Sequence, residues 1–106
     1  MNKSDFGQWL ELAHGFTPEV EFHPVRKWRF DWAIPERKVA VEFQGFVGKR
    51  HGHGDVGHAS VGGMLRDQEK WTEGQLLGWT VILVNAKTVG DGKAQDWIER
   101  ALGATT

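Results

Sequence analysis

Apolar and polar residues alternate along residues 25–34 and again along residues 39–44, which is the period of a strand with one buried face. Residues 35–38, Pro-Glu-Arg-Lys, lie between the two stretches and are typical of a turn. The pattern therefore predicts a β-hairpin. Its apolar face is expected to carry Trp28, Phe30, Trp32, Ile34, Val39, Val41 and Phe43.

Three stretches have apolar residues at helical spacing. Residues 5–14 predict an amphipathic helix that is capped by Ser4 and stops at Gly15. Residues 64–77 predict a second helix and residues 91–103 a third. We expect the second to carry Met64, Trp71 and Gln75 on one stripe beside Leu65, Thr72 and Leu76, and the third to carry Ala94, Trp97, Ile98, Ala101 and Leu102.

Two more strands are expected, a short edge strand at residues 20–23 and a buried strand at residues 79–84. Residues 45–63 contain seven glycines and three histidines, and this composition predicts a long loop. The predicted order is helix, three strands, loop, helix, strand and helix. It indicates one α/β domain, residues 1–106, with a mixed sheet and a C-terminal helix.

Composition limits the class of protein. The chain has 106 residues, 40% of them hydrophobic, with six Trp and six Phe, which is enough for one packed core and excludes a disordered tail. It has no cysteine, so disulfides and thiolate zinc sites are excluded. No apolar run resembles a signal segment or could span a bilayer, so we expect a cytoplasmic protein without a membrane partner.

The register of the hairpin brings polar residues together as well as apolar ones. A turn centred between residues 36 and 37 matches apolar residues across the two strands: Ile34 with Val39, Trp32 with Val41 and Phe30 with Phe43. The other face then carries Asp31 opposite Glu42 and Arg29 opposite Gln44. Two carboxylates are therefore predicted to face each other on one side of the sheet.

Opposed carboxylates about 5 Å apart at Cβ repel each other, and a bound cation would remove this penalty. Hard oxygen ligands favour Mg²⁺, with Mn²⁺ as a substitute, so Asp31 and Glu42 are candidate metal ligands. The alternative is an ordinary solvated sheet, on which Arg29 pairs diagonally with Asp31 and Glu42 faces water.

Three strings, "RKWRFDWAIPERKVAVEFQG", "RHGHG" and "DQEKWTEGQLLGW", resemble the PD-(D/E)XK nuclease superfamily, and in particular small phage and bacterial proteins related to very-short-patch-repair endonucleases and Holliday-junction resolvases. The resemblance covers residues 20–84. It implies a restriction-endonuclease-like α-β-β-β-α-β core. It also implies a Mg²⁺-dependent endonuclease that hydrolyses phosphodiester bonds in DNA, either nicking it or selecting a structure, in repair or recombination.

The same resemblance implies roles for single residues. Asp31 corresponds to the metal-binding Asp, Glu42 to the Glu of the E-x-K motif, and the carbonyl of Phe43 to a further metal ligand. The chain departs from the motif at its third position, where Gln44 replaces lysine and cannot take a proton from water. Either Gln44 or Lys70, on the polar flank of the second helix, is expected to position the attacking water.

A further acid is common on the first helix of such nucleases, and here Glu11 and Glu21 compete for that place. Residues 26–50 carry seven Lys or Arg against three Asp or Glu, a local charge of +4, although the whole chain carries −1. We therefore expect DNA, as duplex, nicked or branched substrate, to approach this segment. Its predicted contacts are Arg29, Lys49, Arg50 and His51.

Two other functions remain open at this stage. The loss of the motif lysine at Gln44 and the low isoelectric point also suit a catalytically inactive nucleic-acid-binding module. The histidines of the glycine-rich loop, His51, His53 and His58, suit a zinc-binding interaction domain less well, because no second ligand cluster accompanies them. A nuclease that cuts both strands would favour a homodimer.

Overall fold

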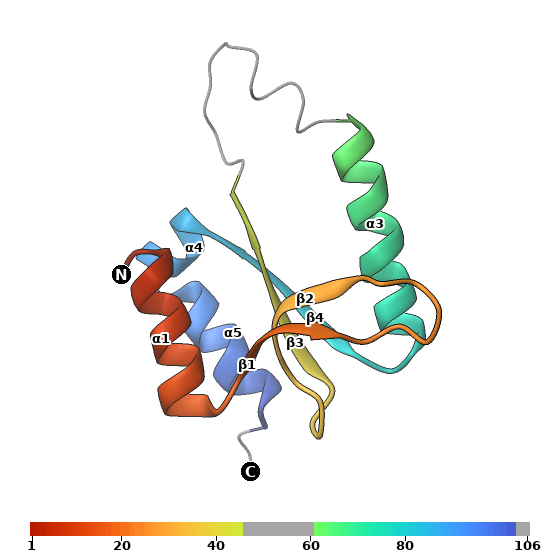
Figure 1. The fold of residues 1–106 in the computed structure, drawn as a ribbon. Coiled ribbons are helices and arrows are strands. Elements are labelled where there is room, and N and C mark those ends of the chain that lie inside the picture. The colour runs from red at the N-terminus through yellow and green to blue at the C-terminus, as the bar shows by residue number, and fades with distance from the viewer. Residues whose placement is uncertain (46–60, 104–106) are drawn as a thin grey trace.

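A four-stranded sheet separates two helical layers (Figure 1). The structure, a computed structural model, describes residues 1–45 and 61–103. The elements in chain order are α1 (Lys3–His14), β1 (Thr17–Glu21), β2 (Arg29–Ile34), β3 (Val39–Gln44), α3 (Val61–Leu76), β4 (Thr80–Asn85), α4 (Ala86–Gly90) and α5 (Lys93–Ala101).

The sheet is mixed, with strand order β1-β2-β3-β4. Strand β2 pairs antiparallel with both β1 and β3, whereas β3 and β4 run parallel, because α3 crosses over between them. The hairpin register is confirmed at three pairs: Ile34 with Val39, Ala33 with Ala40, and Trp32 with Val41. The predicted α/β class, with its mixed sheet and C-terminal helix, is therefore correct.

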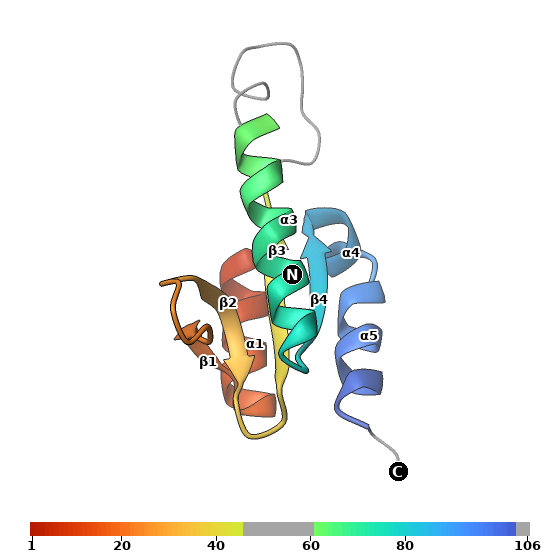
Figure 2. The same ribbon diagram turned by 90° about the vertical axis from the view of Figure 1, so that its right-hand side faces the viewer.

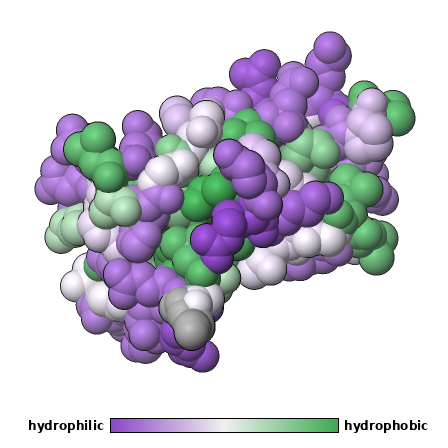
Figure 3. All heavy atoms as spheres, turned by 90° about the horizontal axis from the view of Figure 1, so that it is seen from below, coloured by the Kyte–Doolittle hydropathy of each residue, from purple (hydrophilic) through white to green (hydrophobic). Residues whose placement is uncertain are grey.

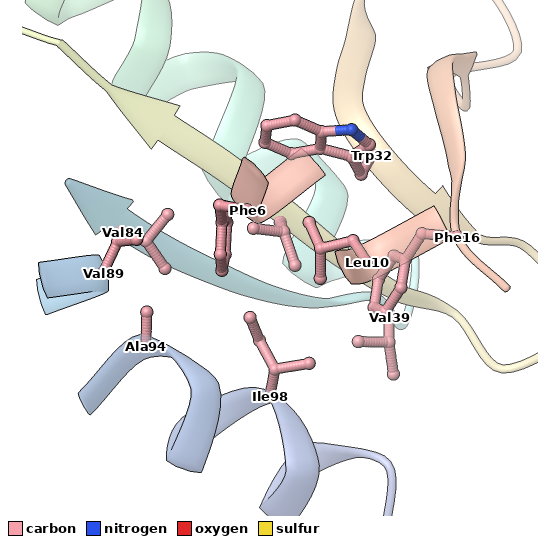
Figure 4. Packing of buried hydrophobic residues seen from close by; sticks show 10 residues of the cluster. Phe6, Leu10, Phe16, Trp32, Val39, Val84, Val89, Ala94 and Ile98 are labelled. Atoms are coloured by element: carbon pink, nitrogen blue, oxygen red, sulfur yellow. The ribbon is translucent and has the colours of Figure 1, made fainter. Parts of the chain in front are cut away.

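The larger core lies between the sheet and α1, α4 and α5 (Figure 4). Phe6 and Leu10 project from α1 onto Trp32 of β2, and the Phe6 and Trp32 rings meet edge to face at 5.8 Å. Ile98 closes this core from α5 and is fully buried. The amphipathic stripes of the first and last helices thus pack on the same side of the sheet.

Helix α3 covers the opposite face (Figure 2). A second cluster there contains Phe30, Ala33, Ala40 and Trp79, with Phe22 packed against it. Phe22 and Phe30 stack at 3.8 Å with their rings 8° apart. The sheet is therefore buried on both sides over its central strands.

The predicted alternation along β2 is wrong at one point. Phe30 packs under α3, whereas Trp32, two residues later, packs under α1, although regular alternation would place both on one face. The β1–β2 register skips the pair formed by Glu19 and Asp31, and Glu19 has a φ of 56°, in the left-handed region. The β2–β3 ladder also stops at Trp32, so the expected pairing of Phe30 with Phe43 does not form.

The predicted stripe of α3 is also wrong, apart from Trp71. Met64 and Leu65 are more than half exposed, and Leu76 is exposed by 77%. The helix instead approaches the sheet at Gly74, where a Cβ atom would lie 3.0 Å from Cζ of Phe30. Because Lys70 and Trp71 precede Gly74 by one helical turn, they face the sheet as well.

Several element boundaries differ from the sequence prediction. Asn2, not Ser4, caps α1, because its side chain accepts a hydrogen bond from the Asp5 N–H at 2.8 Å. The edge strand is at residues 17–21, and the second strand begins only at Arg29. Helix α4 was not predicted, although Asn85 and Thr88 form the capping box that starts it.

Some large apolar side chains stay on the surface, among them Leu12, Val25 and Leu76. Seen from below in Figure 3, hydrophilic residues cover most of the surface and hydrophobic ones gather near the middle of that face. Trp97, predicted to pack, is exposed by 36%. Within residues 1–45 and 61–103, no helix is both long and apolar enough to cross a membrane.

The close approach of α3 at Gly74 gives a first prediction. Gly74→Ala would gain about 1 kcal/mol from helix propensity. The added methyl group would press on the Phe30 ring, which cannot retreat because Phe22 stacks on it and Trp79 lies 5.0 Å away. Overpacking costs about 1–3 kcal/mol. We expect the free energy of unfolding in urea to fall by about 1 kcal/mol.

Gly63→Ala is the matched control in the same helix. Among the described residues, a Cβ atom there would meet only the flexible guanidinium of Arg66, at 3.9 Å, so the propensity gain is not offset. This variant should equal or exceed the wild type in stability. A Gly74→Ala protein that is also as stable as the wild type would contradict the packing described here.

Candidate functional site

The two carboxylates identified from the sequence lie where β2 and β3 separate. The Asp31 carboxylate oxygen Oδ2 accepts a hydrogen bond from the Phe43 N–H at 2.8 Å, and Glu42 Oε2 accepts one from the Asp31 N–H at 2.7 Å. Each carboxylate thus satisfies a backbone N–H group of the other strand, beyond the last ladder pair at Trp32 and Val41. The pair therefore has a structural role, which the sequence did not suggest.

Helix α3 supplies two more donors to Glu42. Nζ of Lys70 lies 2.8 Å from Glu42 Oε1, and the indole Nε1 of Trp71 donates to the same oxygen at 3.1 Å. Lys70 also donates to the carbonyl oxygen of Arg29 at 2.7 Å. Asp31, Glu42 and Lys70 are therefore brought together, whereas Trp71 is a member of the site that we had assigned to core packing.

The surroundings of Glu42 shift its pKa in both directions. Its side chain is 7% exposed and that of Lys70 is 14% exposed, so the ion pair is largely removed from water. Burial raises the pKa of Glu42, and the nearby Asp31 charge raises it further. The hydrogen bond and charge of Lys70 and the Asp31 N–H lower the pKa, but the net shift is upward.

The donor chemistry of the pair suits a hard divalent cation. Both carboxylates offer oxygen ligands, and Asp31 Oδ1 accepts no hydrogen bond from any residue that the structure describes. No group of three or more His, Cys, Asp or Glu side chains able to hold a metal occurs within residues 1–45 and 61–103. A two-carboxylate site fits Mg²⁺, which commonly keeps several of its waters.

The other residues predicted for the site lie at its margin or away from it. Gln44 follows Glu42 by two residues at the end of β3, beside Asn85 of β4. Arg29 is exposed and pairs with Glu21 at 3.4 Å, so Glu21 is held by an arginine of the next strand.

Glu11 is exposed on α1, which covers the opposite face of the sheet from α3, so the structure does not bring Glu11 to the carboxylate pair. The Phe43 N–H binds Asp31, while the Phe43 ring packs at the edge of the larger core. The remaining predicted contacts, Lys49, Arg50 and His51, and the histidines His53 and His58 lie outside the described residues.

Trp71 could have been found from the sequence. Lys70, Trp71 and Gly74 share one side of a helix, and a glycine within a helix often marks close approach to a neighbouring element. A polar residue one turn before such a glycine is expected to meet that neighbour. The apolar residues Met64 and Leu76, on which the predicted stripe depends, are exposed.

Comparison with known proteins finds relatives whose function is not described. The chain is 32% identical over 76 residues to two proteins of Mycobacterium tuberculosis, uncharacterized protein Rv2248 of strain H37Rv and uncharacterized protein MT2308 of strain CDC 1551. The alignment covers 67% of this chain but 25% of each relative, so the chain spans about a quarter of the length of the curated relatives that it matches. No family model and no solved structure matches the chain.

The raised pKa of Glu42 predicts a pH dependence of stability. A carboxyl group with a higher pKa in the folded chain than in the unfolded chain holds its proton more tightly when folded. The contribution of Glu42 to the free energy of unfolding should therefore fall as pH rises from its ordinary pKa of 4.5 through the raised value. Glu42→Gln should remove this part of the pH dependence in urea unfolding.

Glu36→Gln, at the exposed hairpin turn, is the control and should keep the pH dependence of the wild type. The informative quantity is the stability of the wild type minus that of Glu42→Gln, measured at several pH values above 4.5. A difference that does not change with pH would show that Glu42 titrates normally in the folded chain.

Proposed function

We propose that this chain is a metal-dependent nuclease that hydrolyses phosphodiester bonds in DNA, with Asp31, Glu42 and Lys70 at its active site. The observation that carries the proposal is the 2.8 Å contact between Lys70 Nζ and Glu42 Oε1 beside Asp31. This contact supplies, from α3, the positive charge that the E-x-K pattern loses at Gln44. The resemblance to PD-(D/E)XK nucleases supports the same assignment.

In this proposal Asp31 and Glu42 hold Mg²⁺ or Mn²⁺, which would supply charge to the scissile phosphate and a more acidic bound water. The chain's own residues orient these groups. The Phe43 N–H fixes Asp31, and the Asp31 N–H fixes Glu42, so neither carboxylate rotates freely. Lys70 is the group able to stabilise negative charge on a phosphate next to them.

Gln44 has a smaller part in this proposal than Lys70. Its amide can orient water by hydrogen bonding but carries no charge. Arg29, exposed on the same strand as Asp31, and Lys49, Arg50 and His51 of the loop are proposed to contact the DNA backbone. A nuclease of this kind would act in the cytoplasm of a bacterial or phage-infected cell, and cutting both strands would favour a homodimer.

A catalytically inactive DNA-binding module is the second candidate, and one observation favours it. Glu42 already accepts hydrogen bonds from the Asp31 N–H, Lys70 and Trp71, so both of its oxygens have partners without a metal. Such a carboxylate would fulfil a structural role in a chain that binds DNA without cutting it.

An assay of cleavage separates the two candidates. The wild type is incubated with supercoiled plasmid, single-stranded DNA, branched DNA and RNA in Mg²⁺ or Mn²⁺. Asp31→Asn, Glu42→Gln and Lys70→Met should each lower the cleavage rate by about 100-fold or more, because each removes a charge that acts on the reacting phosphate. Gln44→Leu should lower it less.

Glu36→Gln, at the exposed hairpin turn, controls for the loss of a carboxylate away from the site and should cleave like the wild type, whereas loss of cleavage in the site variants purified in parallel excludes a contaminating nuclease. Cleavage that survives both Asp31→Asn and Glu42→Gln would disprove the site. DNA binding by the wild type with no cleavage of any substrate in either metal would favour the inactive module.

A further inference from the structure

Lys70 supplies a positive charge to one of the two carboxylates for which a cation was expected from the sequence. Its ammonium lies 2.8 Å from Glu42 Oε1, whereas no ion pair joins it to Asp31. The helix cannot easily withdraw this lysine, because Gly74, one turn later, packs directly on Phe30. The packing of α3 therefore fixes the backbone of Lys70 near Glu42, whereas its side chain can still move.

We infer that Lys70 is an internal counter-ion that competes with a divalent metal for Glu42, and that metal binding exchanges Lys70 away from Oε1. This inference rests on the proposed function only in taking Asp31 and Glu42 as the metal ligands. Oε1 of Glu42 already accepts from Lys70 and Trp71, so a metal can bind this oxygen only by replacing one of them. Oε2 accepts only the Asp31 N–H among the described residues and keeps a lone pair, but a metal there would share the carboxylate with the Lys70 ammonium, and the two cations would repel each other.

The contacts indicate which partner gives way. Oε2 is tied to the Asp31 N–H at 2.7 Å within the sheet, and releasing it would leave a backbone donor unpaired. Oε1 is shared by Lys70 and Trp71. Lys70 has a second acceptor, the Arg29 carbonyl at 2.7 Å, and its long side chain can turn towards solvent, so it can leave Oε1 at lower cost.

The indole N–H of Trp71 can report whether a metal binds at Glu42. Its indole N–H donates to the same oxygen that Lys70 contacts, at 3.1 Å. A metal at Glu42 changes the charge that this N–H experiences, whichever way Lys70 moves. Trp9, on α1, lies on the other side of the sheet and should not respond.

The first experiment follows the Trp71 indole signal of the full wild-type chain in ¹H–¹⁵N spectra during a Mg²⁺ titration. The signal is assigned with Trp71→Phe. We expect a saturable shift of the Trp71 signal, an unchanged Trp9 signal, and no Trp71 shift in Glu42→Gln. A Trp71 signal unaffected by saturating Mg²⁺ and Mn²⁺ would overturn the inference.

The second experiment measures Mn²⁺ affinity by calorimetry in Lys70→Met and in the wild type. Removing a competing internal cation should tighten the apparent dissociation constant by about tenfold or more, because the competent state is then fully populated. Arg29→Gln is the matched control: it removes a positive charge from the strand of Asp31, but its guanidinium pairs with Glu21 and not with Glu42. It should change the affinity much less.

If Lys70→Met and Arg29→Gln tighten Mn²⁺ binding equally, the cause is a general loss of positive charge, and the competition between Lys70 and the metal is overturned. If Lys70→Met does not fold, Lys70→Gln is measured in its place, because the Trp71 shift reports metal binding at Glu42 and not the departure of Lys70. A failure of the proposed nuclease function would give different results from a failure of the competition. Tighter Mn²⁺ binding in Lys70→Met, together with no cleavage of any nucleic acid by the wild type, would leave the competition standing and remove the nuclease. Cleavage by the wild type, with Mn²⁺ affinity unchanged in Lys70→Met, would support the nuclease and overturn the competition.

Discussion

The buried carboxylate of Glu42 is the constraint on which the arrangement of this chain depends. A carboxylate removed from water must be compensated by charge and hydrogen bonds, and removing one partner of such a buried pair typically costs about 3–5 kcal/mol. Glu42 obtains its partners from a neighbouring strand, through the Asp31 N–H, and from α3, through Lys70 and Trp71. The separation of β2 from β3 and the docking of α3 therefore satisfy one and the same group.

The aromatic cluster beneath α3 makes that docking specific. Phe30 changes face relative to Trp32, stacks on Phe22 and leaves room for only a glycine at position 74 of the helix. Without this close approach, Lys70 and Trp71, one turn earlier, would stand farther from β3. The break in alternation at Asp31 thus has two consequences: it opens the ladder at the carboxylates, and it creates the surface that brings α3 to them.

Periodicity was sufficient to predict the parts of the fold that are regular. The apolar stripes on α1 and the match of Trp32 with Val41 across the hairpin follow from local patterns, and the mixed α/β class follows from the order of elements. The change of face at Phe30 could not be predicted this way, because it depends on Glu19 of the neighbouring strand adopting a positive φ and on α3 packing from elsewhere in the chain. Asp31 and Glu42 were found by register, whereas the contact of Lys70 needed the helix to be placed.

Charge at the site separates the two candidate functions. With both carboxylates ionised, Asp31, Glu42 and Lys70 sum to −1, a field that repels a phosphodiester. A module that only binds DNA would then have to do so elsewhere on its surface, because this site opposes the backbone. The proposed nuclease needs a site that attracts phosphate, and a divalent cation on the carboxylates would make the sum +1. In the structure without metal, Lys70 compensates the charge of Glu42, and under the proposal a metal would take over that role and make the same residues attractive to a phosphate.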